Sequence, residues 1–565
     1  MLFRSDFNFF LNAGHDLGAN YQLYAFGSFG IRDADGAGYY RRANDVRNRD
    51  FAASPTSFVP FYADGFLPII DSRIKDGSAA VGIKGELGGG WNEDLSVVYG
   101  TNQLVYQVEN SFNTSLGGVF SPTKFRAGSL SFGQTVANLD ISKKFDVGFV
   151  DSLGLAFGGE YRNENFKITA GETSSYINGP YSVNGAAGGA QVFPGFRPNN
   201  AVDVSRDSFA GYAEADADIS KTFTLQLAGR YEHFSDFGDT VNGKAAARFE
   251  PIRGIAVRGS VSTGFRAPSL AQQYFATTST NSTVVNGSSQ LIEVGTFPAT
   301  SAVATALGGK ALKPEKALNF SGGVALNPFA GLSLTADYYN IRIRDRVVLT
   351  ENLTGAAVVN LLNGAGITNV TSARFFVNGV DTRTQGVDVV GTYRVPDMGL
   401  GKIVLTAGFN YNTTKITDRA SLPSLPGVIL FGRTESYRLT DGQPRTKLNL
   451  SADWDYGPVG LTLRTNRYGS VFSASGTSAS PSIAKGLVPG DFTLSPKWVS
   501  DVEVRVHPVE QVTLAVGADN VFDVYPDRVP LGGAFAPNSY FLPYSTLSPF
   551  GFNGRFLYGR IAFNF

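Results

Sequence analysis

The sequence predicts an all-β protein, a transmembrane antiparallel β-barrel, and three observations lead to this fold class. The composition is rich in glycine, with 66 residues, and in aromatic residues, at 13%, while charged residues make up only 17%. Segments in which apolar and polar residues alternate recur from one end of the chain to the other. The connections between them are alternately short and long. Short turns at one rim and long loops at the other are typical of bacterial outer-membrane barrels.

The alternation places apolar and polar side chains on opposite faces of each strand. In the segment 445–457, Leu448 and Trp454 lie on one face. Asn449 and Asp453 lie on the other. Such a polar face would be costly inside a soluble sandwich, but it suits a strand whose other face meets lipid while this one lines a wet lumen.

We predict about nineteen strands, most of them near the ~9–11 residues that a tilted membrane strand needs. The expected ranges are 7–17, 21–33, 78–87, 93–110, 129–145, 153–168, 206–219, 223–234, 240–252, 255–266, 316–328, 332–345, 381–395, 401–416, 445–457, 459–472, 495–509, 512–523 and 555–565. The expected long loops are 34–77, 169–205, 267–315, 346–380, 417–444, 473–494 and 524–554. The last strand ends on the barrel-terminal aromatic residue, Phe565.

The expected strand directions predict an incomplete barrel. Because the strand direction alternates at each turn, the first and the last expected strand both run toward the periplasm. A bacterial single-chain barrel normally has an even number of antiparallel strands, so that its first and last strands run in opposite directions. The first residues also lack the basic region and apolar stretch of a signal peptide. We therefore expect an N-terminally truncated protein.

Other classes of protein find little support. The chain has no cysteine, which excludes disulfides, thiolate metal sites and cysteine nucleophiles, and its net charge of zero without a basic block argues against nucleic-acid binding. His15, His233 and His507 are isolated, and we expect no catalytic site, metal or cofactor. The stretch 33–36 resembles the start of a calcium loop, but Asn44 stands where an acidic ligand is required, so an ordinary turn is favoured.

Five short stretches between 260 and 523, in order, carry a resemblance to a known family. They are SVSTGFRAPSLAQQYF at 260–275, LKPEKALNF at 312–320, LTADYYNIRIRD at 334–345, TQGVD at 384–388 and DNVFD at 519–523. They resemble TonB-dependent outer-membrane receptors, whose barrels have about 22 strands. The resemblance implies that 1–565 is the barrel domain of such a receptor, with about 19 strands visible and with the plug domain and the TonB box missing.

The resemblance also implies function and partners. A receptor of this family lies in the outer membrane of a Gram-negative cell, binds a scarce, bulky nutrient at its extracellular loops, and imports it with energy from TonB. Ferric siderophores are the commonest cargo; cobalamin, haem and glycans are the main competitors. The implied partners are TonB with its inner-membrane motor, through the missing N-terminal part, outer-membrane lipid, the barrel-assembly machinery and a small-molecule chelate.

Two other functions stay open at the level of sequence. An ungated passive diffusion porin would have no need of a plug, although the motifs and the long loops argue against it. A secreted β-rich hydrolase would need a catalytic constellation, and the sequence contains no such arrangement.

The ligand site is expected where the long loops converge over the lumen. Aromatic rings and arginines can stack on, and pair with, an anionic chelate. For each residue alone, packing between loops or an interfacial girdle is the more common role. The candidate residues are Tyr39, Tyr40, Arg41, Arg42, Phe58, Phe61, Tyr62, Phe193, Phe196, Arg197, Tyr274 and Phe275.

Charged residues also share strand faces. Glu214, Asp216 and Asp218 lie on one face of 206–219, and Arg258 and Arg266 share a face of 255–266. A catalytic carboxylate pair is one interpretation of the acidic set. We favour a charged lumen wall that faces the plug or water.

Overall fold

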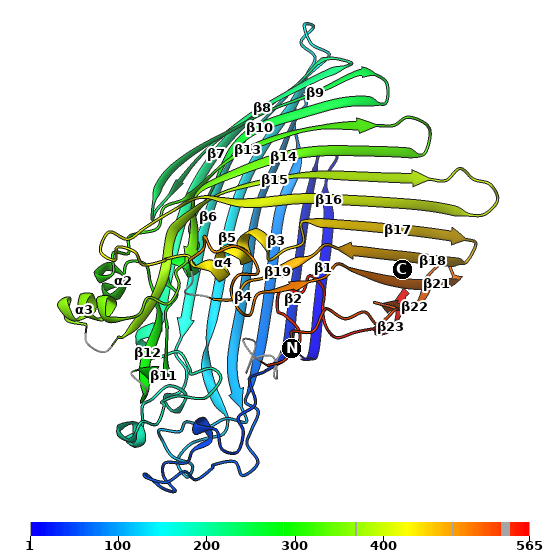
Figure 1. Ribbon diagram of the computed structural model, residues 1–565. Coiled ribbons are helices and arrows are strands. Elements are labelled where there is room, and N and C mark those ends of the chain that lie inside the picture. Colours follow the sequence, from blue (N-terminus) through cyan, green and yellow to red (C-terminus); the bar gives the residue numbers. More distant parts are fainter. Residues whose placement is uncertain (1, 286–287, 368–369, 477–479, 533–542, 564–565) are drawn as a thin grey trace.

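Nineteen antiparallel strands of the computed structural model form one curved wall within the described residues, which are 2–285, 288–367, 370–476, 480–532 and 543–563 (Figure 1). The wall strands are β1 (Leu2–Leu17), β2 (Tyr21–Ala37), β3 (Ile69–Gly88), β4 (Trp91–Glu109), β5 (Phe125–Phe145), β6 (Ser152–Thr169), β7 (Val202–Ser220), β8 (Phe223–Phe234), β9 (Gly238–Ile252), β10 (Ile255–Arg266), β13 (Glu315–Leu326), β14 (Leu332–Leu349), β15 (Ser372–Arg394), β16 (Lys402–Arg419), β17 (Thr446–Tyr456), β18 (Val459–Tyr468), β21 (Lys497–Val509), β22 (Val512–Asp519) and β23 (Phe556–Phe563). The fold class and the nineteen expected strands are confirmed.

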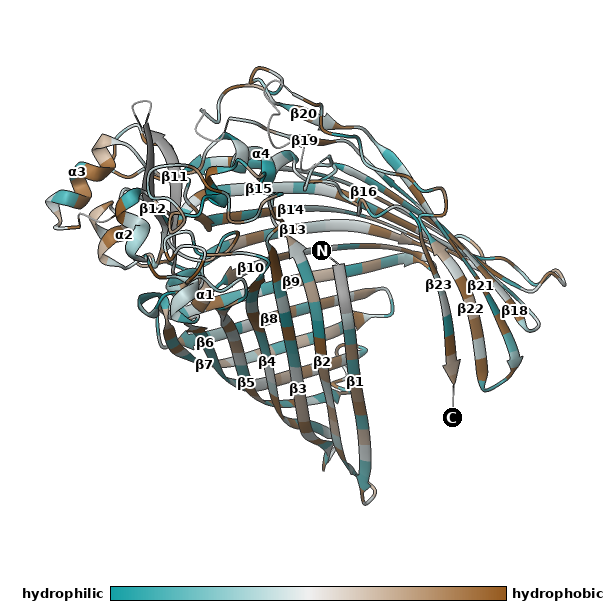
Figure 2. Cartoon of the chain, turned by 90° about the horizontal axis from the view of Figure 1, so that it is seen from below, coloured by the Kyte–Doolittle hydropathy of each residue, from teal (hydrophilic) through white to brown (hydrophobic). Residues whose placement is uncertain are grey.

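The wall strands pair in chain order, with β10 beside β13 and β18 beside β21. Within the described part of the chain, β1 pairs only with β2 and β23 only with β22, so these two strands are the edges of the sheet (Figure 2). Because nineteen antiparallel strands form the series, β1 and β23 run in the same direction. The expected terminal residue, Phe565, lies outside the described residues.

Several strands extend further toward the long loops than the alternation predicts. The strand expected at 78–87 begins at Ile69, and the one expected at 381–395 begins at Ser372. The backbone ladder continues there, as the pairs Ala37↔Ile69 and Leu349↔Phe376 show. The alternation of apolar and polar residues marks only the part of a strand that meets lipid, whereas the hydrogen-bond ladder continues beyond it.

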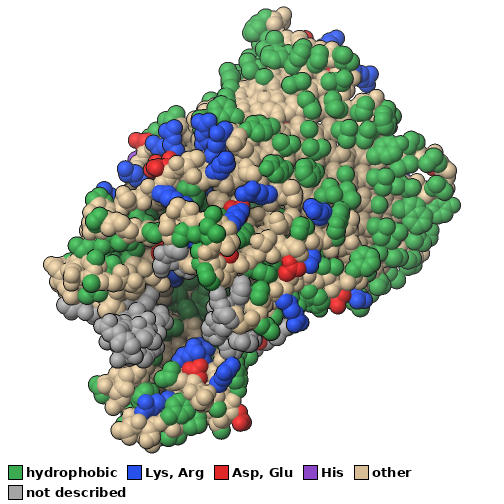
Figure 3. Space-filling view, in the orientation of Figure 1, with side chains coloured by type: hydrophobic (Ala, Val, Ile, Leu, Met, Phe, Trp, Pro, Cys, Tyr) green, Lys and Arg blue, Asp and Glu red, His purple; other side chains and the backbone are tan. Residues whose placement is uncertain are grey.

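The two faces of the wall differ as expected. In β8, Leu227 and Tyr231 are both 50% exposed on one face, while Arg230 and Glu232 lie on the other and form an ion pair of 2.9 Å. Figure 3 shows hydrophobic side chains spread over the wall, with most Lys, Arg, Asp and Glu nearer the loops. None of the helices in the described ranges is long and apolar enough to span a membrane.

The long loops contain short helices and strands of their own. They hold α1 (Leu270–Tyr274), β11 (Thr277–Val285), β12 (Ser288–Phe297), α2 (Ala302–Ala306), α3 (Ala356–Gly364), α4 (Arg433–Asp441), β19 (Val471–Ser473), β20 (Phe492–Leu494) and the short 3-10 helices η1 (Val46–Asn48), η2 (Thr173–Ser175), η3 (Pro180–Asn184) and η4 (Pro198–Asn200). The strand expected at 459–472 ends at Tyr468, and its remainder contributes β19, which pairs with β20.

The loops also carry an apolar core of their own. A large cluster joins α2, α3 and the loop end of β15, and its members Leu307, Leu362 and Phe375 have no exposed surface. A polar barrel wall offers little for apolar burial, so the loops bury their hydrophobic side chains against each other. The loop rim is therefore a packed structure.

Candidate ligand site in the long loops

A buried ion pair joins two long loops. Arg433, the first residue of α4, lies in the connection between β16 and β17, and Asp491 lies in the connection between β18 and β21, just before β20. The Arg433 side chain is fully buried, and that of Asp491 is 4% exposed. Nη1 of Arg433 lies 2.7 Å from Oδ1 of Asp491, and Nη2 lies 2.8 Å from Oδ2. This bidentate geometry is the strong form of an arginine–carboxylate pair.

The surroundings of this pair satisfy its remaining polar atoms. Arg433 also donates to the carbonyl oxygens of Ser475, Ile483 and Ala484, so that all five of its N–H groups have acceptors. Burial raises the pKa of Asp491, but hydrogen bonds from Arg433 and from the backbone N–H groups of Ser475 and Gly486 outweigh it and lower the pKa below its ordinary value. The carboxylate of Asp491 therefore stays ionised, and its hydrogen bonds with Arg433 hold the two loops together.

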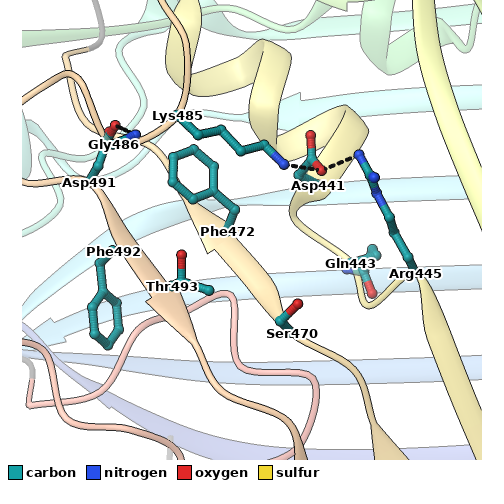
Figure 4. A pocket seen from close by; sticks show the side chains of 10 residues that line it. All are labelled: Asp441, Gln443, Arg445, Ser470, Phe472, Lys485, Gly486, Asp491, Phe492 and Thr493. Carbon is teal, nitrogen blue, oxygen red and sulfur yellow. Dashed lines mark hydrogen bonds and ion pairs between the residues drawn. The ribbon is translucent and has the colours of Figure 1, made fainter.

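A pocket of about 470 Å³ lies beside the ion pair (Figure 4). Its wall combines residues from the α4 loop with residues from the loop that carries β19 and β20. They are Asp441, Gln443, Arg445, Ser470, Phe472, Lys485, Gly486, Asp491, Phe492 and Thr493.

Two cations share one carboxylate in the wall of this pocket. Oδ1 of Asp441 accepts from Nζ of Lys485 at 2.5 Å and from Nη2 of Arg445 at 2.7 Å. Burial raises the pKa of Asp441, but the hydrogen bonds from Lys485 and Thr440 and the charges of Lys485 and Arg445 outweigh it, so the pKa is lowered. Two positive charges against one negative charge leave this group with a net charge of +1.

An aromatic ring lies against the same lysine. Nζ of Lys485 is 5.2 Å from the centre of the Phe472 ring and 5.7 Å from that of Tyr437, within the range of a cation–π contact. The pocket therefore offers positive charge, hydroxyl groups and aromatic carbon, which suits an anionic organic ligand. The described residues contain no group of three or more His, Asp or Glu that could hold a metal ion.

None of the residues that line this pocket was among the expected ligand residues. The available signal was that charged residues stand in two of the expected long loops, Arg433 and Asp441 in one, Lys485 and Asp491 in the other. Nothing in their spacing reveals that these loops meet.

The first group of expected ligand residues divides between the surface and the interior of its loop. Tyr39 and Tyr40 are 40% and 41% exposed, and Arg42 is exposed. Arg41 is only 6% exposed, and its Nη1 donates to the carbonyl oxygen of Tyr39 at 2.6 Å. Burial, assisted by the nearby charge of Arg47, lowers the pKa of Arg41 to about 10.

The second group also divides. Phe61 stacks on Phe112, with ring centres 4.4 Å apart, and Tyr62 lies 4.7 Å from Phe66. Burial raises the pKa of Tyr62. Phe58 remains 43% exposed. Two of these three rings therefore pack inside the loop, and Phe58 keeps a free face.

The third and fourth groups come together in one apolar cluster. Phe193 and Phe196 are 5.5 Å apart, and Phe196 lies 6.2 Å from Phe275 at the end of α1. Tyr274 packs against the same cluster, in which Phe196 is 2% exposed. Arg197 is half-buried at the start of η4, where its backbone N–H donates to Asn200. A role of these residues in ligand binding stays a prediction.

The charged residues of the wall form two separate sets. Glu214, Asp216 and Asp218 line a hollow of about 300 Å³ together with Lys143 and Lys144. Within the set, Glu214 accepts a hydrogen bond from Gln226 at 2.7 Å, and Asp218 accepts one from Ser152 at 2.7 Å.

The arginines of β10 pair elsewhere. Arg258 forms a bidentate pair with Asp337 of β14, at 2.8 and 2.6 Å, and Arg266 pairs with Glu315 of β13. These contacts link neighbouring strands. Whether the two charged sets also face a plug stays a prediction.

Comparison with known proteins adds a family and a set of similar folds. The family model described as TonB dependent receptor-like, beta-barrel, matches residues 5–521. No curated protein matches the sequence. Among solved structures, a mutant of the ferric enterobactin receptor PfeA from Pseudomonas aeruginosa is similar, with a TM-score of 0.60 and 14% identity over 99% of this chain and 77% of that one.

Two further solved structures are similar to the same extent. The siderophore receptor PirA from Acinetobacter baumannii has a TM-score of 0.57 and 14% identity, over 99% of this chain and 78% of that one. The FrpB iron transporter from Neisseria meningitidis has a TM-score of 0.58 and 12% identity, over 99% and 72%. At these identities the likeness shows a shared fold.

Proposed function

The chain belongs to the family of TonB-dependent receptors, and we propose that it binds a ferric siderophore at its long loops and imports it with energy supplied by TonB. Members of this family lie in the outer membrane of Gram-negative bacteria and carry out active transport, which supports the same location and general activity for this chain. The observation that carries the proposal is the family match over 5–521, which includes every wall strand except β23 and every expected long loop except 524–554. We also propose that residues 1–565 make up one barrel domain.

The construction of the loop rim supports a receptor that captures its ligand. The apolar cluster around Leu307 and Phe375 and the buried pair of Arg433 and Asp491 keep the loops in a defined arrangement. A preorganised surface loses less conformational entropy on binding, which favours high affinity for a scarce ligand. A passive pore has no need of such a surface.

The names of the similar structures support an iron chelate as cargo. PfeA is a ferric enterobactin receptor, PirA a siderophore receptor and FrpB an iron transporter. A ferric siderophore is commonly anionic, and the loop rim of this chain offers arginines, lysine and exposed tyrosines. Among the expected loop residues, we propose Tyr39, Tyr40, Arg42 and Phe58 as ligand contacts, since each of them is exposed.

The proposal is tested by uptake of radioactive iron. The full-length receptor is produced in an iron-starved Gram-negative host without its own siderophore receptors, and accumulation of a panel of ⁵⁵Fe-chelates is measured with and without TonB. We expect saturable uptake of at least one chelate that is lost without TonB. Uptake that rises linearly with concentration and ignores TonB would instead identify a passive pore.

A further inference from the structure

We propose that the pocket between α4 and the β19–β20 hairpin binds a carboxylate group of the transported molecule, with Arg445 and Lys485 as its ligands. This inference rests on the proposed transport function and narrows the chemical class of its substrate. It starts from the arrangement drawn in Figure 4, in which both cations point toward one carboxylate, Asp441.

The charge of the group favours one added anion. Lys485, Arg445 and Asp441 together carry +1, so a single carboxylate brings the group to neutrality. Both cations retain exposed surface, with side-chain exposures of 42% for Lys485 and 50% for Arg445. Among the described residues, no acceptor lies on Nε or Nη1 of Arg445, so the N–H groups of these two nitrogens can donate to an added carboxylate.

The rest of the wall fits an organic ligand with hydroxyl groups. Gln443, Ser470 and Thr493 line the pocket, and in the described part of the chain their side chains make no hydrogen bond. Phe472 adds an apolar wall. The volume of about 470 Å³ lies within the ~300–1,000 Å³ of typical small-molecule sites.

The pocket is preorganised by residues other than those that would bind. The buried pair of Arg433 and Asp491 fixes the two loops that form the wall. Asp441 is only 8% exposed, but it has two cation partners, so removing one of them leaves it paired with the other. Changes to the exposed cations are therefore expected to alter binding and leave the loops folded.

The carboxylate could belong to a ferric carboxylate chelate or to a uronic acid of a glycan. The experiment measures equilibrium binding to the full-length receptor in outer membranes, with ⁵⁵Fe-citrate and labelled trigalacturonate as the two carboxylate probes. Ferrichrome and maltotriose are the corresponding probes without a carboxylate. The amount of each variant in the outer membrane is measured by immunoblot.

The variants are expected to act in opposite directions. Lys485→Gln and Arg445→Gln each remove a charge-assisted hydrogen bond and should weaken binding of a carboxylate probe about tenfold. Asp441→Asn removes the competing carboxylate and should strengthen binding of a carboxylate probe about threefold to tenfold. If these three residues had only a structural role, all three variants would change the affinity for the carboxylate probes in the same direction.

A matched control, Arg438, lies on α4, the helix that ends at Asp441. Arg438 is 55% exposed and pairs with Glu435 at 2.7 Å, but it does not line the pocket. Arg438→Gln should leave the affinity for every probe unchanged.

The outcomes separate this inference from the proposed function. In one outcome, the receptor binds ferrichrome with the same affinity in all three variants and binds neither carboxylate probe. This result overturns the carboxylate site but is compatible with iron transport. In another outcome, the affinity for trigalacturonate changes in the three variants as expected, and no iron chelate binds. This result supports the site and overturns iron as the cargo. Absence of binding by both carboxylate probes, with the receptor present in the membrane, overturns the inference.

Discussion

Arg433 and Asp491 face each other in a buried, bidentate ion pair, with 2.7 Å between Nη1 and Oδ1, although 58 positions separate them in the sequence. Burying a charge pair is favourable only when its other polar atoms are satisfied, and Arg433 has acceptors for all five donors. The pair therefore fastens the α4 loop to the loop of the β19–β20 hairpin.

Removing one partner of this pair should release both loops. Arg433→Ala leaves the carboxylate of Asp491 buried without its cation, which costs about 3–5 kcal/mol. We expect trypsin to cut within 420–445 and 473–494, while the wall keeps its resistance to unfolding in detergent gels. The double variant Arg433→Met with Asp491→Leu should restore much of the protection, because it leaves no unpaired charge. Equal cutting of the double variant and the single variant would contradict this account.

Acid should loosen the same loops. The pKa of Asp491 is lowered in the fold, so its stabilising contribution is present above the ordinary Asp pKa of ~3.9 and is lost as the pH falls through the lower folded-state pKa. The 565 residues contain no cysteine, so Leu487→Cys, at a position where Leu487 is 71% exposed, gives a single labelling site.

The measurement is the fluorescence anisotropy of a dye attached at that cysteine. We expect it to stay constant between about pH 5 and pH 8 and to fall below about pH 4. In the background of Asp491→Asn the acid step should be absent, since the titrating carboxyl is gone. An acid step of the same size in that background would assign the effect to another group.

Two phenylalanines of one loop should behave differently. Phe61 stacks on Phe112, so Phe61→Ala leaves a cavity and costs about 3–5 kcal/mol of local stability. Phe58 is 43% exposed, and Phe58→Ala should leave the loop intact while lowering affinity for the ligand. Proteolysis of 34–68 reports the first effect and chelate binding the second. Unchanged binding in Phe58→Ala would remove Phe58 from the ligand site.

Neighbouring residues of β8 should differ in their tolerance of charge. Leu227 is 50% exposed on the apolar face, where an arginine at the bilayer midplane costs about 2–4 kcal/mol. Gln226 lies on the opposite face, where it donates to Glu214 at 2.7 Å and accepts from Lys244 at 2.7 Å, so an arginine there stands beside Lys244 but gains Glu214 as an anionic partner. The fraction of folded receptor in the outer membrane should fall for Leu227→Arg and stay unchanged for Gln226→Arg. If the folded fraction fell for Gln226→Arg and not for Leu227→Arg, the polar face of β8 would be the one that meets lipid.

The wall could be predicted because its signal is local. The alternation of Gln226, Leu227 and their neighbours is imposed by lipid on one side and water on the other, and a period of two along the chain is enough to reveal it. The same signal fails at the rim, where β3 and β15 continue for several residues past the end of the alternation. Beyond the membrane, only backbone hydrogen bonds hold the strand in the sheet, and these do not require an alternation of apolar and polar side chains.

The loop residues could be named by type but not by role. Arg41 and Arg42 are adjacent and chemically identical, yet Arg41 is buried against Tyr39 and Gln191 while Arg42 is exposed. Phe58 and Phe61 differ in the same way. Which of two similar side chains is buried depends on loops that arrive from distant parts of the sequence.

The sequence by itself determined the fold class, the nineteen strands, the two faces of the wall and the family, because each rests on short-range patterns. Only the tertiary structure decided that Asp441 meets Lys485, 44 positions away, and that Arg433 meets Asp491. The physical reason is that loops have no periodic environment to impose a pattern on them. Their arrangement follows from burial of apolar side chains and satisfaction of charges across long distances in the chain.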